Sequence, residues 1–190
     1  MDQNLIQCPG CKVLLPSQDD LIGHQGSLGR YGVTSPECEA LFNEILARFF
    51  DQFSTNPGLI LPIDAYAVQH PPHFEHQAAL NISKRFIDAS VQSVGIHLVI
   101  LYLMVEKKMS KSEAGKIANQ ILVNGPATLP YLEPPLDLGT IKVTDIAQAS
   151  NAHELEVLTF QWAQSAWNAW SAHHETIRNW YIMYGRKSQK

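Results

Sequence analysis

The sequence of 190 residues predicts an all-α protein, in which a helical bundle-like domain follows a loop-rich N-terminal module. Two observations support this prediction. Apolar residues recur at helical spacing in several long stretches after residue 36. Residues 1–36 instead contain five glycines and three prolines, a density that prevents long regular elements. We therefore divide the chain into a module at 1–38 and a helical domain at 39–190.

The first helix is predicted at about 36–54. Ser35 can cap its N-terminus, Pro36 suits the first turn, and an acidic residue follows at Glu37. The next stretch, 59–76, is repeatedly interrupted by proline, and we expect it to be mostly irregular.

Two further helices follow. A continuous apolar stripe predicts a long helix at about 77–107, in which Gly95 marks either a close crossing or a break. A shorter helix is predicted from Ser110 to about Val123, because Ser110 and Glu113 have the spacing of a capping box.

The C-terminal part begins with a proline-rich strap at 129–135, a short extended piece at 140–143 and a turn of helix from Thr144. The longest helix is predicted at about 152–184. It carries the four tryptophans, for which we expect core positions with indole partners such as the carboxylates of Asp64 or Glu133. The alternative is an aromatic pocket or a protein interface. The tryptophans are Trp162, Trp167, Trp170 and Trp180.

Composition and charge exclude several classes. Hydrophobic residues make up 45% and charged residues 17%, as in a globular protein, and the net charge of −4 leaves no basic surface for nucleic acid. The first seven residues lack the features of a secretory signal. The apolar run at 94–105 is shorter than the roughly 20 residues of a membrane span. We therefore expect a cytoplasmic protein with no nucleic-acid or membrane partner.

A cysteine and histidine pattern in the module predicts a zinc site. Cys8 and Cys11 form a Cys-Pro-Gly-Cys knuckle, His24 follows after twelve residues, and Cys38 follows after thirteen more. Thiolates and imidazole favour tetrahedral zinc, and four ligands would make the site structural. Zinc binding would then supply on the order of 10 kcal/mol to the folding of the module. The alternatives are a redox dithiol, inert thiols, or a distant histidine such as His174 in place of His24.

The other histidines suggest a second site. His70, His97 and His173, with His174 next to it, could hold a second metal with an open position, and Asp64 or Glu133 could act as base. Trp162 and His173 are predicted to share a helix face. The alternative is a polar core network in which Asp64, Tyr66 or Gln69 satisfies His97.

Two functions remain open. The protein is either a zinc-binding protein with a pocket lined by histidine, aspartate and tryptophan, suited to metal-dependent hydrolysis or group transfer, or a zinc-stabilised protein-interaction module. Its partner would be a small molecule or a protein. No nucleophile elbow, phosphate-binding loop or dinucleotide fingerprint is present, which argues against acyl-serine, kinase and dinucleotide chemistry. Whether the protein is an enzyme stays open.

Six motifs extend over nearly the whole chain. They are Cys-Pro-Gly-Cys at 8–11, Ser-Pro-x-Cys ending at Cys38, Asp-Ala-Tyr-Ala-Val-Gln-His-Pro at 64–71, Ser-Val-x-x-His-Leu at 93–98, Leu-Glu-Pro-Pro at 132–135 and Trp-Ala-x-x-x-Trp-x-Ala-Trp-x-x-His-His at 162–174. Together they resemble a bacterial family of small proteins with a domain of unknown function. The resemblance implies a shared site and no particular reaction.

Overall fold

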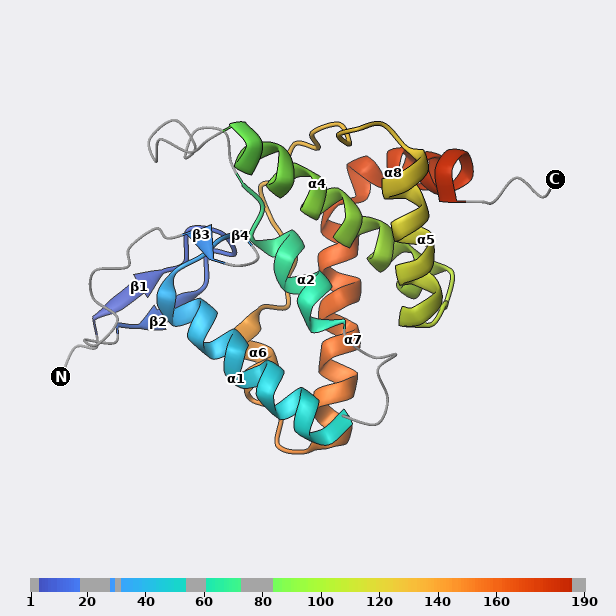
Figure 1. Ribbon diagram of the computed structural model, residues 1–190. Helices are drawn as coiled ribbons and strands as arrows, with labels where there is room; N and C mark the ends of the chain where they lie inside the picture. The colour runs from blue at the N-terminus through green and yellow to red at the C-terminus, as the bar shows by residue number, and fades with distance from the viewer. Residues whose placement is uncertain (1–3, 18–27, 30–31, 54–60, 73–83, 186–190) are drawn as a thin grey trace.

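The computed structural model describes residues 4–17, 28–29, 32–53, 61–72 and 84–185. Most of these residues are helical, as the sequence predicts, and the short strands lie in the N-terminal part (Figure 1). The helices surround a central short helix, and the strands lie beside the start of the first helix.

Two small antiparallel hairpins occupy the N-terminal part. In the first, β1 (Leu5–Gln7) pairs with β2 (Leu14–Pro16), with Ile6 opposite Leu15. In the second, β3 (Leu28–Gly29) pairs with β4 (Gly32–Val33). The turn between β1 and β2 contains the Cys-Pro-Gly-Cys knuckle, so the first hairpin presents both cysteines from one tight loop.

The first long helix, α1 (Pro36–Phe53), lies where the sequence predicts it. Ser35 Oγ accepts a hydrogen bond from the amide of Cys38 at 3.3 Å, which is the expected N-cap contact. This cap fixes Cys38 in the first turn of the helix.

A second helix, α2 (Pro62–Gln69), corrects the prediction that 59–76 is mostly irregular. Pro62 occupies the first turn of α2, where proline removes no helical hydrogen bond, and Pro71 and Pro72 follow the end of the helix. The prolines therefore bound α2 and do not interrupt it. The helix packs against α4 and α7, and all but one of its residues are buried.

The long helix at the centre of the sequence is α4 (Lys84–Leu101), which continues into a π-helical turn, η3 (Tyr102–Glu106). The predicted start at 77 lies outside the described residues. Gly95 marks a close crossing, because a Cβ there would lie 3.0 Å from Leu129 Cδ1 and 3.3 Å from the Trp180 ring. The stretch Asp88–Glu106 is long and apolar enough to cross a membrane, but 56% of its most apolar window is buried inside the fold, as in a core helix.

The next helix, α5 (Lys111–Asn124), begins with the predicted capping box. Glu113 N donates to Ser110 Oγ at 3.3 Å, and Ser110 N donates to Glu113 Oε2 at 3.0 Å. The short helix α6 (Val143–Ala147) starts where a turn of helix was expected, and residues 140–142 before it are not a strand.

The prediction of one helix over 152–184 is wrong, because the helix breaks at Trp170. The observed elements are α7 (Ala152–Ala169), the 3-10 turn η4 (Ser171–His173), α8 (His174–Trp180) and the π-helical turn η5 (Tyr181–Gly185). The spacing that placed Trp162 and His173 on one face therefore does not apply, because the helical repeat ends between them.

All four tryptophans are buried in the core, as predicted. Their indole partners differ from those expected. Trp162 Nε1 donates to Gln69 Oε1 at 2.8 Å, and Trp167 Nε1 donates to Glu106 Oε1 at 3.0 Å. Trp170 Nε1 donates to the carbonyl of Val68 at 3.1 Å. Two of the three recorded indole partners lie on α2, so the tryptophans fix this central helix in place.

Candidate metal centre

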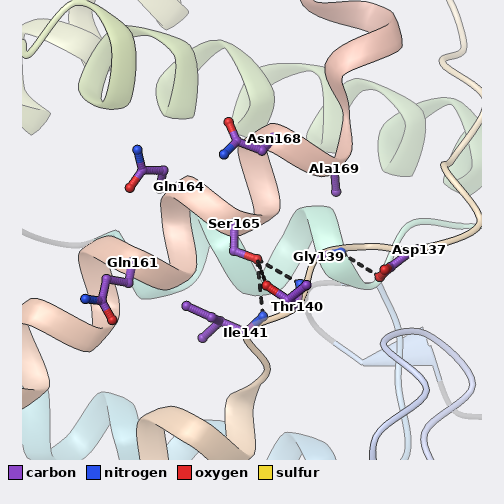
Figure 2. A pocket seen from close by; sticks show the side chains of 9 residues that line it. All are labelled: Asp137, Gly139, Thr140, Ile141, Gln161, Gln164, Ser165, Asn168 and Ala169. Carbon is purple, nitrogen blue, oxygen red and sulfur yellow. Dashed lines mark hydrogen bonds between the residues drawn. The ribbon is translucent and has the colours of Figure 1, made fainter.

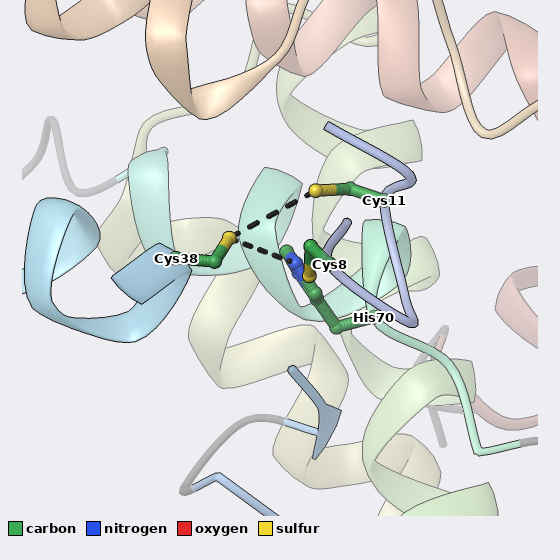
Figure 3. A group of neighbouring side chains, drawn as sticks. All are labelled: Cys8, Cys11, Cys38 and His70. Carbon is green, nitrogen blue, oxygen red and sulfur yellow. Dashed lines mark hydrogen bonds between the residues drawn. The ribbon is translucent and has the colours of Figure 1, made fainter. Parts of the chain in front are cut away.

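Four potential metal ligands meet where the first hairpin, α1 and α2 converge. The donor atoms of Cys8, Cys11, Cys38 and His70 all lie within 4.8 Å of one another, and all four residues are buried (Figure 3). Two ligands come from the hairpin turn, one from the first turn of α1 and one from the residue that ends α2.

The hairpin turn has the geometry of a metal knuckle. The amide of Cys8 donates to the carbonyl of Val13 at 2.9 Å, and the amide of Lys12 donates back to the carbonyl of Cys8 at 3.0 Å. Lys12 has a φ of 65°, the left-handed conformation that turns the chain directly after Cys11. These contacts bring both thiols to the same side of the turn.

Gly10 is required for the knuckle to fit against α2. A Cβ at this position would lie 2.5 Å from His70 Cδ2 and would overlap the carbonyl oxygen of Val33. The amide of Val33 in turn donates to the carbonyl of His70 at 3.1 Å. The close approach of three segments therefore depends on the missing side chain.

His70 is oriented as a metal ligand by the backbone of its own helix. Its Nδ1 lies 2.7 Å from the carbonyl oxygen of Tyr66, which fixes the proton on Nδ1, since a carbonyl can only accept. Nε2, the nitrogen that is left to bind a metal, faces the thiols, 3.4 Å from Cys38 Sγ. A histidine whose second nitrogen donates to a carbonyl is the usual arrangement at metal sites.

Two distances between donor atoms match those around a tetrahedral ion. With metal–sulfur and metal–nitrogen bonds of about 2.3 Å and 2.0–2.1 Å, tetrahedral geometry requires about 3.8 Å between two sulfurs and about 3.6 Å between sulfur and nitrogen. The structure has 3.8 Å between the sulfurs of Cys11 and Cys38 and 3.4 Å between Cys38 Sγ and His70 Nε2. The donor set thus fits a metal ion of this geometry.

Two hydroxyl groups lie beside the sulfurs of Cys38 and Cys8. Tyr66 Oη donates to Cys38 Sγ at 3.6 Å, and Thr34 Oγ1 lies 3.7 Å from Cys8 Sγ. The two hydroxyls are themselves 2.7 Å apart. The Tyr66 ring stacks on Phe42 with centroids 3.8 Å apart, so the phenol is held rigidly beside the site.

The charges of the thiols are strongly coupled. Hydrogen bonds from Cys11 and Cys38 lower the pKa of Cys8, whereas hydrogen bonding to Cys11 and Cys8, with burial, raises the pKa of Cys38. One thiolate therefore suppresses ionisation of its neighbour unless a cation compensates both. Burial alone would lower the pKa of His70, but the hydrogen bonds and charges of Cys11 and Cys8 raise it to about 9. Burial and the charge of Cys38 also raise the pKa of Tyr66.

The structure thus brings Cys8, Cys11 and Cys38 together with His70. The predicted ligand His24 lies outside the described residues, so its role stays a prediction. Sequence spacing did not reveal His70 as a partner of the cysteines. The available signal is its place directly after a helix bounded by Pro62 and Pro71, but the density of prolines predicts an irregular stretch there.

The candidates for a second site lie in separate networks. His97 Nδ1 hydrogen-bonds to Asp64 Oδ1 at 2.8 Å, and the other Asp64 oxygen pairs with Lys111. His173 Nε2 hydrogen-bonds to the carbonyl of Glu133 at 2.8 Å. Within the part of the chain that the structure describes, no metal-type cluster contains these histidines.

His174 stacks on Trp167, with ring centroids 3.7 Å apart, and its Nε2 hydrogen-bonds to the carbonyl of the same residue at 3.0 Å. It therefore lies at the start of α8, outside the cysteine cluster. The arrangement of Asp64 and His97 is the polar core network that was the alternative to a second metal.

The chain belongs to a family of unknown function (DUF5946), which matches residues 6–171. All four residues of the cysteine and histidine cluster lie within this span. No curated protein and no solved structure matches the chain.

Proposed function

We propose that Cys8, Cys11, Cys38 and His70 bind one structural zinc ion and that the protein is a zinc-stabilised interaction module. The observation that carries this proposal is the group of four buried donor atoms within 4.8 Å of one another. Three thiols and one imidazole are the donors of closed tetrahedral zinc sites.

The proposed ion has a structural role because of what the ligands connect. Four protein donors leave no coordination position for water or substrate. The ligands come from the first hairpin, α1 and α2, so one ion would fasten a hairpin with only three residue pairs to the helical core. Since α2 also carries Gln69 and Val68, the partners of two tryptophans, the ion would stabilise the centre of the fold.

The interaction function is favoured over hydrolysis by the placement of the candidate catalytic groups. Both oxygens of Asp64 are engaged, one by His97 and one by Lys111. His173 is bound to a backbone carbonyl at a different place in the fold. A metal-bound water would need three of these groups around one ion, and the described residues offer no such arrangement.

Metal content tests the proposal. Elemental analysis of protein purified without chelator or histidine tag should give one zinc per chain in the wild type and in His97→Ala, and much less in Cys38→Ser and His70→Ala. His24→Ala serves as the matched histidine control and should keep its zinc. If His70→Ala retains its zinc and His24→Ala loses it, the fourth ligand is His24 and not His70. The absence of zinc from the wild type would overturn the proposal.

A further inference from the structure

Four exposed apolar side chains gather where the end of α5 lies beside η5, and we call them the apolar patch. They are Leu122, Val123, Ile182 and Met183, which are 40%, 73%, 54% and 58% exposed. The two segments are joined by a hydrogen bond of 3.4 Å from Asn124 Nδ2 to the carbonyl of Tyr184. Neighbouring exposed apolar residues of this kind mark a surface that a membrane or a partner covers.

The folded structure holds the apolar patch in place. Gly185 lets η5 pack directly on α5, because a Cβ there would lie 2.9 Å from Ile117 Cγ2 and 3.5 Å from Ile121 Cδ1. Ile121 is fully buried in this contact, whereas the next two residues of α5 belong to the patch and are exposed. The patch is therefore a fixed feature of the surface.

Basic residues border the apolar patch. Lys116 is exposed and shares a face of α5 with Val123, since seven residues make about two helical turns. After Gly185 the sequence continues as Arg-Lys-Ser-Gln-Lys, with three basic residues and no apolar one. Arg186 and Lys187 follow Met183 by three and four residues, so the chain cannot carry them more than about 15 Å from it, at no more than about 3.6 Å per residue.

The acidic residues nearest along the chain act weakly at the patch. Glu113 belongs to the capping box at the other end of α5, about 15 Å from Val123 at about 1.5 Å per residue. Glu175 lies at the start of α8, about 10 Å before the patch by the same rise. Glu106 is paired with Arg178 at 2.7 Å. Since salt screens exposed charges over about 8 Å, these groups and the net charge of −4 leave the basic border effective.

The apolar patch is separate from the two large hollows of the described structure. A polar hollow of about 580 Å³ lies between α7 and residues 137–141, where Ser165 Oγ accepts from the amides of Thr140 and Ile141 (Figure 2). An apolar hollow of about 460 Å³ is lined mainly by α7. No residue of the patch lines either hollow. The patch side chains project into solvent, which suits insertion into a fluid apolar layer.

Two other occupants fit the patch less well. A second copy of the chain would bring its own basic border against that of the first, and like charges oppose such an association. Protein interfaces rely on tryptophan, tyrosine and arginine as anchors, and the patch contains none of the three. An apolar surface with lysine and arginine beside it is instead typical of segments that lie in a membrane interface.

We propose that the apolar patch and the basic residues after Gly185 dock on the surface of a membrane that contains anionic lipids. The apolar side chains would enter the boundary between headgroups and acyl chains, and the basic ones would lie at the headgroups. The sequence argument against a membrane partner concerns a spanning helix, which this docking does not require. The inference rests on the proposed interaction function and names its partner. Figure 1 shows α5 and α8 at the opposite side of the molecule from the strands beside the metal centre.

Sedimentation of the full, zinc-loaded chain with lipid vesicles tests the proposal. We expect binding to vesicles of phosphatidylcholine with phosphatidylserine, no binding to phosphatidylcholine alone, and weaker binding at raised salt. Val123→Gln with Met183→Gln should weaken binding at least about tenfold, because two side chains lose their apolar surface. Leu136→Gln is the matched control, since it changes a fully exposed apolar residue before α6 and should bind as the wild type does.

The basic border has its own variant. Arg186→Gln with Lys187→Gln should weaken binding to the anionic vesicles about 25-fold, at about fivefold for each basic residue near the surface. Binding that is unchanged in this variant, or equal for the two kinds of vesicle, would contradict the role of charge and overturn the proposal.

Three further results would overturn the inference. The first is no binding to either vesicle, which would point to an acidic protein surface as the partner. The second is equal binding by the wild type and the variant Val123→Gln with Met183→Gln. The third is a dimer of the wild type that this variant abolishes, which would show that a second copy covers the patch. Zinc analysis of the same samples separates the two proposals. One zinc per chain without vesicle binding contradicts only the membrane surface, whereas vesicle binding by a chain without zinc contradicts only the metal centre.

Discussion

Tyr66 positions two of the four candidate ligands from opposite ends of one residue. Its carbonyl oxygen lies 2.7 Å from Nδ1 of His70, and its phenol donates to the sulfur of Cys38 at 3.6 Å. The ring between these two groups is buried and stacked on Phe42. A single residue of α2 therefore links His70, at the end of α2, to Cys38 in α1.

Tyr66→Phe should weaken metal binding without removing a ligand. The ring stacking and the backbone contact to His70 stay, but the hydrogen bond to Cys38 is lost and Thr34 loses one of its hydrogen-bond partners. Partners of metal ligands typically contribute about 10–100-fold in affinity, and we expect about tenfold here, measured by competition with a chelator. Tyr184→Phe, far from the cluster in sequence and structure, is the control. Unchanged affinity in Tyr66→Phe would show that the phenol only fills space.

Gly10→Ala should destabilise the protein by about 1–3 kcal/mol, the usual cost of overpacking. The new methyl group would press against His70 and the carbonyl of Val33, both parts of a rigid centre. Gly115→Ala is a matched control, because nothing lies within 4 Å of a Cβ there and α5 would gain helix propensity of about 0.5–1 kcal/mol. Denaturant unfolding should therefore shift in opposite directions for the two variants. Equal shifts would contradict the close packing of the knuckle on α2.

Local chemistry explains what the sequence could predict. The start of α1 follows from Ser35 and Pro36, and the start of α5 follows from the capping box of Ser110 and Glu113. Such caps depend on residues at most four positions apart, so a sequence displays them directly. The knuckle of Cys8 and Cys11 is local in the same sense.

The features that the sequence did not predict depend on contacts between segments that are distant in the chain. His70 joins the cysteines only because α2 runs into the centre of the fold. The prolines at both ends of α2 give this stretch the sequence pattern of a loop. The break at Trp170 is equally non-local. The amide of Trp170 donates a hydrogen bond to the carbonyl of Trp167, and its indole donates to the carbonyl of Val68 on α2. Periodicity continues through such a break, since the apolar pattern does not record where the backbone turns.

Removing Lys111 should cost more stability than removing the charge of Asp64. Asp64 is fully buried, whereas 22% of the Lys111 side chain is exposed. Lys111→Met would leave a buried carboxylate with His97 alone, and we expect a loss of about 3 kcal/mol. Asp64→Asn leaves a lysine that can reach water, and we expect about 1–2 kcal/mol. The measurement is the free energy of unfolding from urea titrations.

The double variant provides the control for this ion pair. Residues that contact each other show coupling of about 0.5–3 kcal/mol, so Lys111→Met with Asp64→Asn should be less destabilised than the sum of the single variants. Additive effects, or a loss below about 0.5 kcal/mol in Lys111→Met, would mean that the pair contributes little.

Glu106 should make stability depend on pH in the acidic range. Partial burial raises its pKa, but hydrogen bonds from Arg178 and Trp167 outweigh burial, so the net pKa is lowered from 4.5. The carboxylate therefore stabilises the fold above its unfolded pKa, and this contribution disappears as the pH falls through the folded pKa. Because Glu106 and Arg178 are partly exposed, we expect only about 0.5–1 kcal/mol from Glu106→Gln at neutral pH. Thermal unfolding between about pH 3 and pH 7 should show the variant and the wild type converging at the acid end. Glu156→Gln, an exposed carboxylate on α7, is the control. A difference that grows on acidification would contradict the lowered pKa, since protonation must remove the advantage of the charged form.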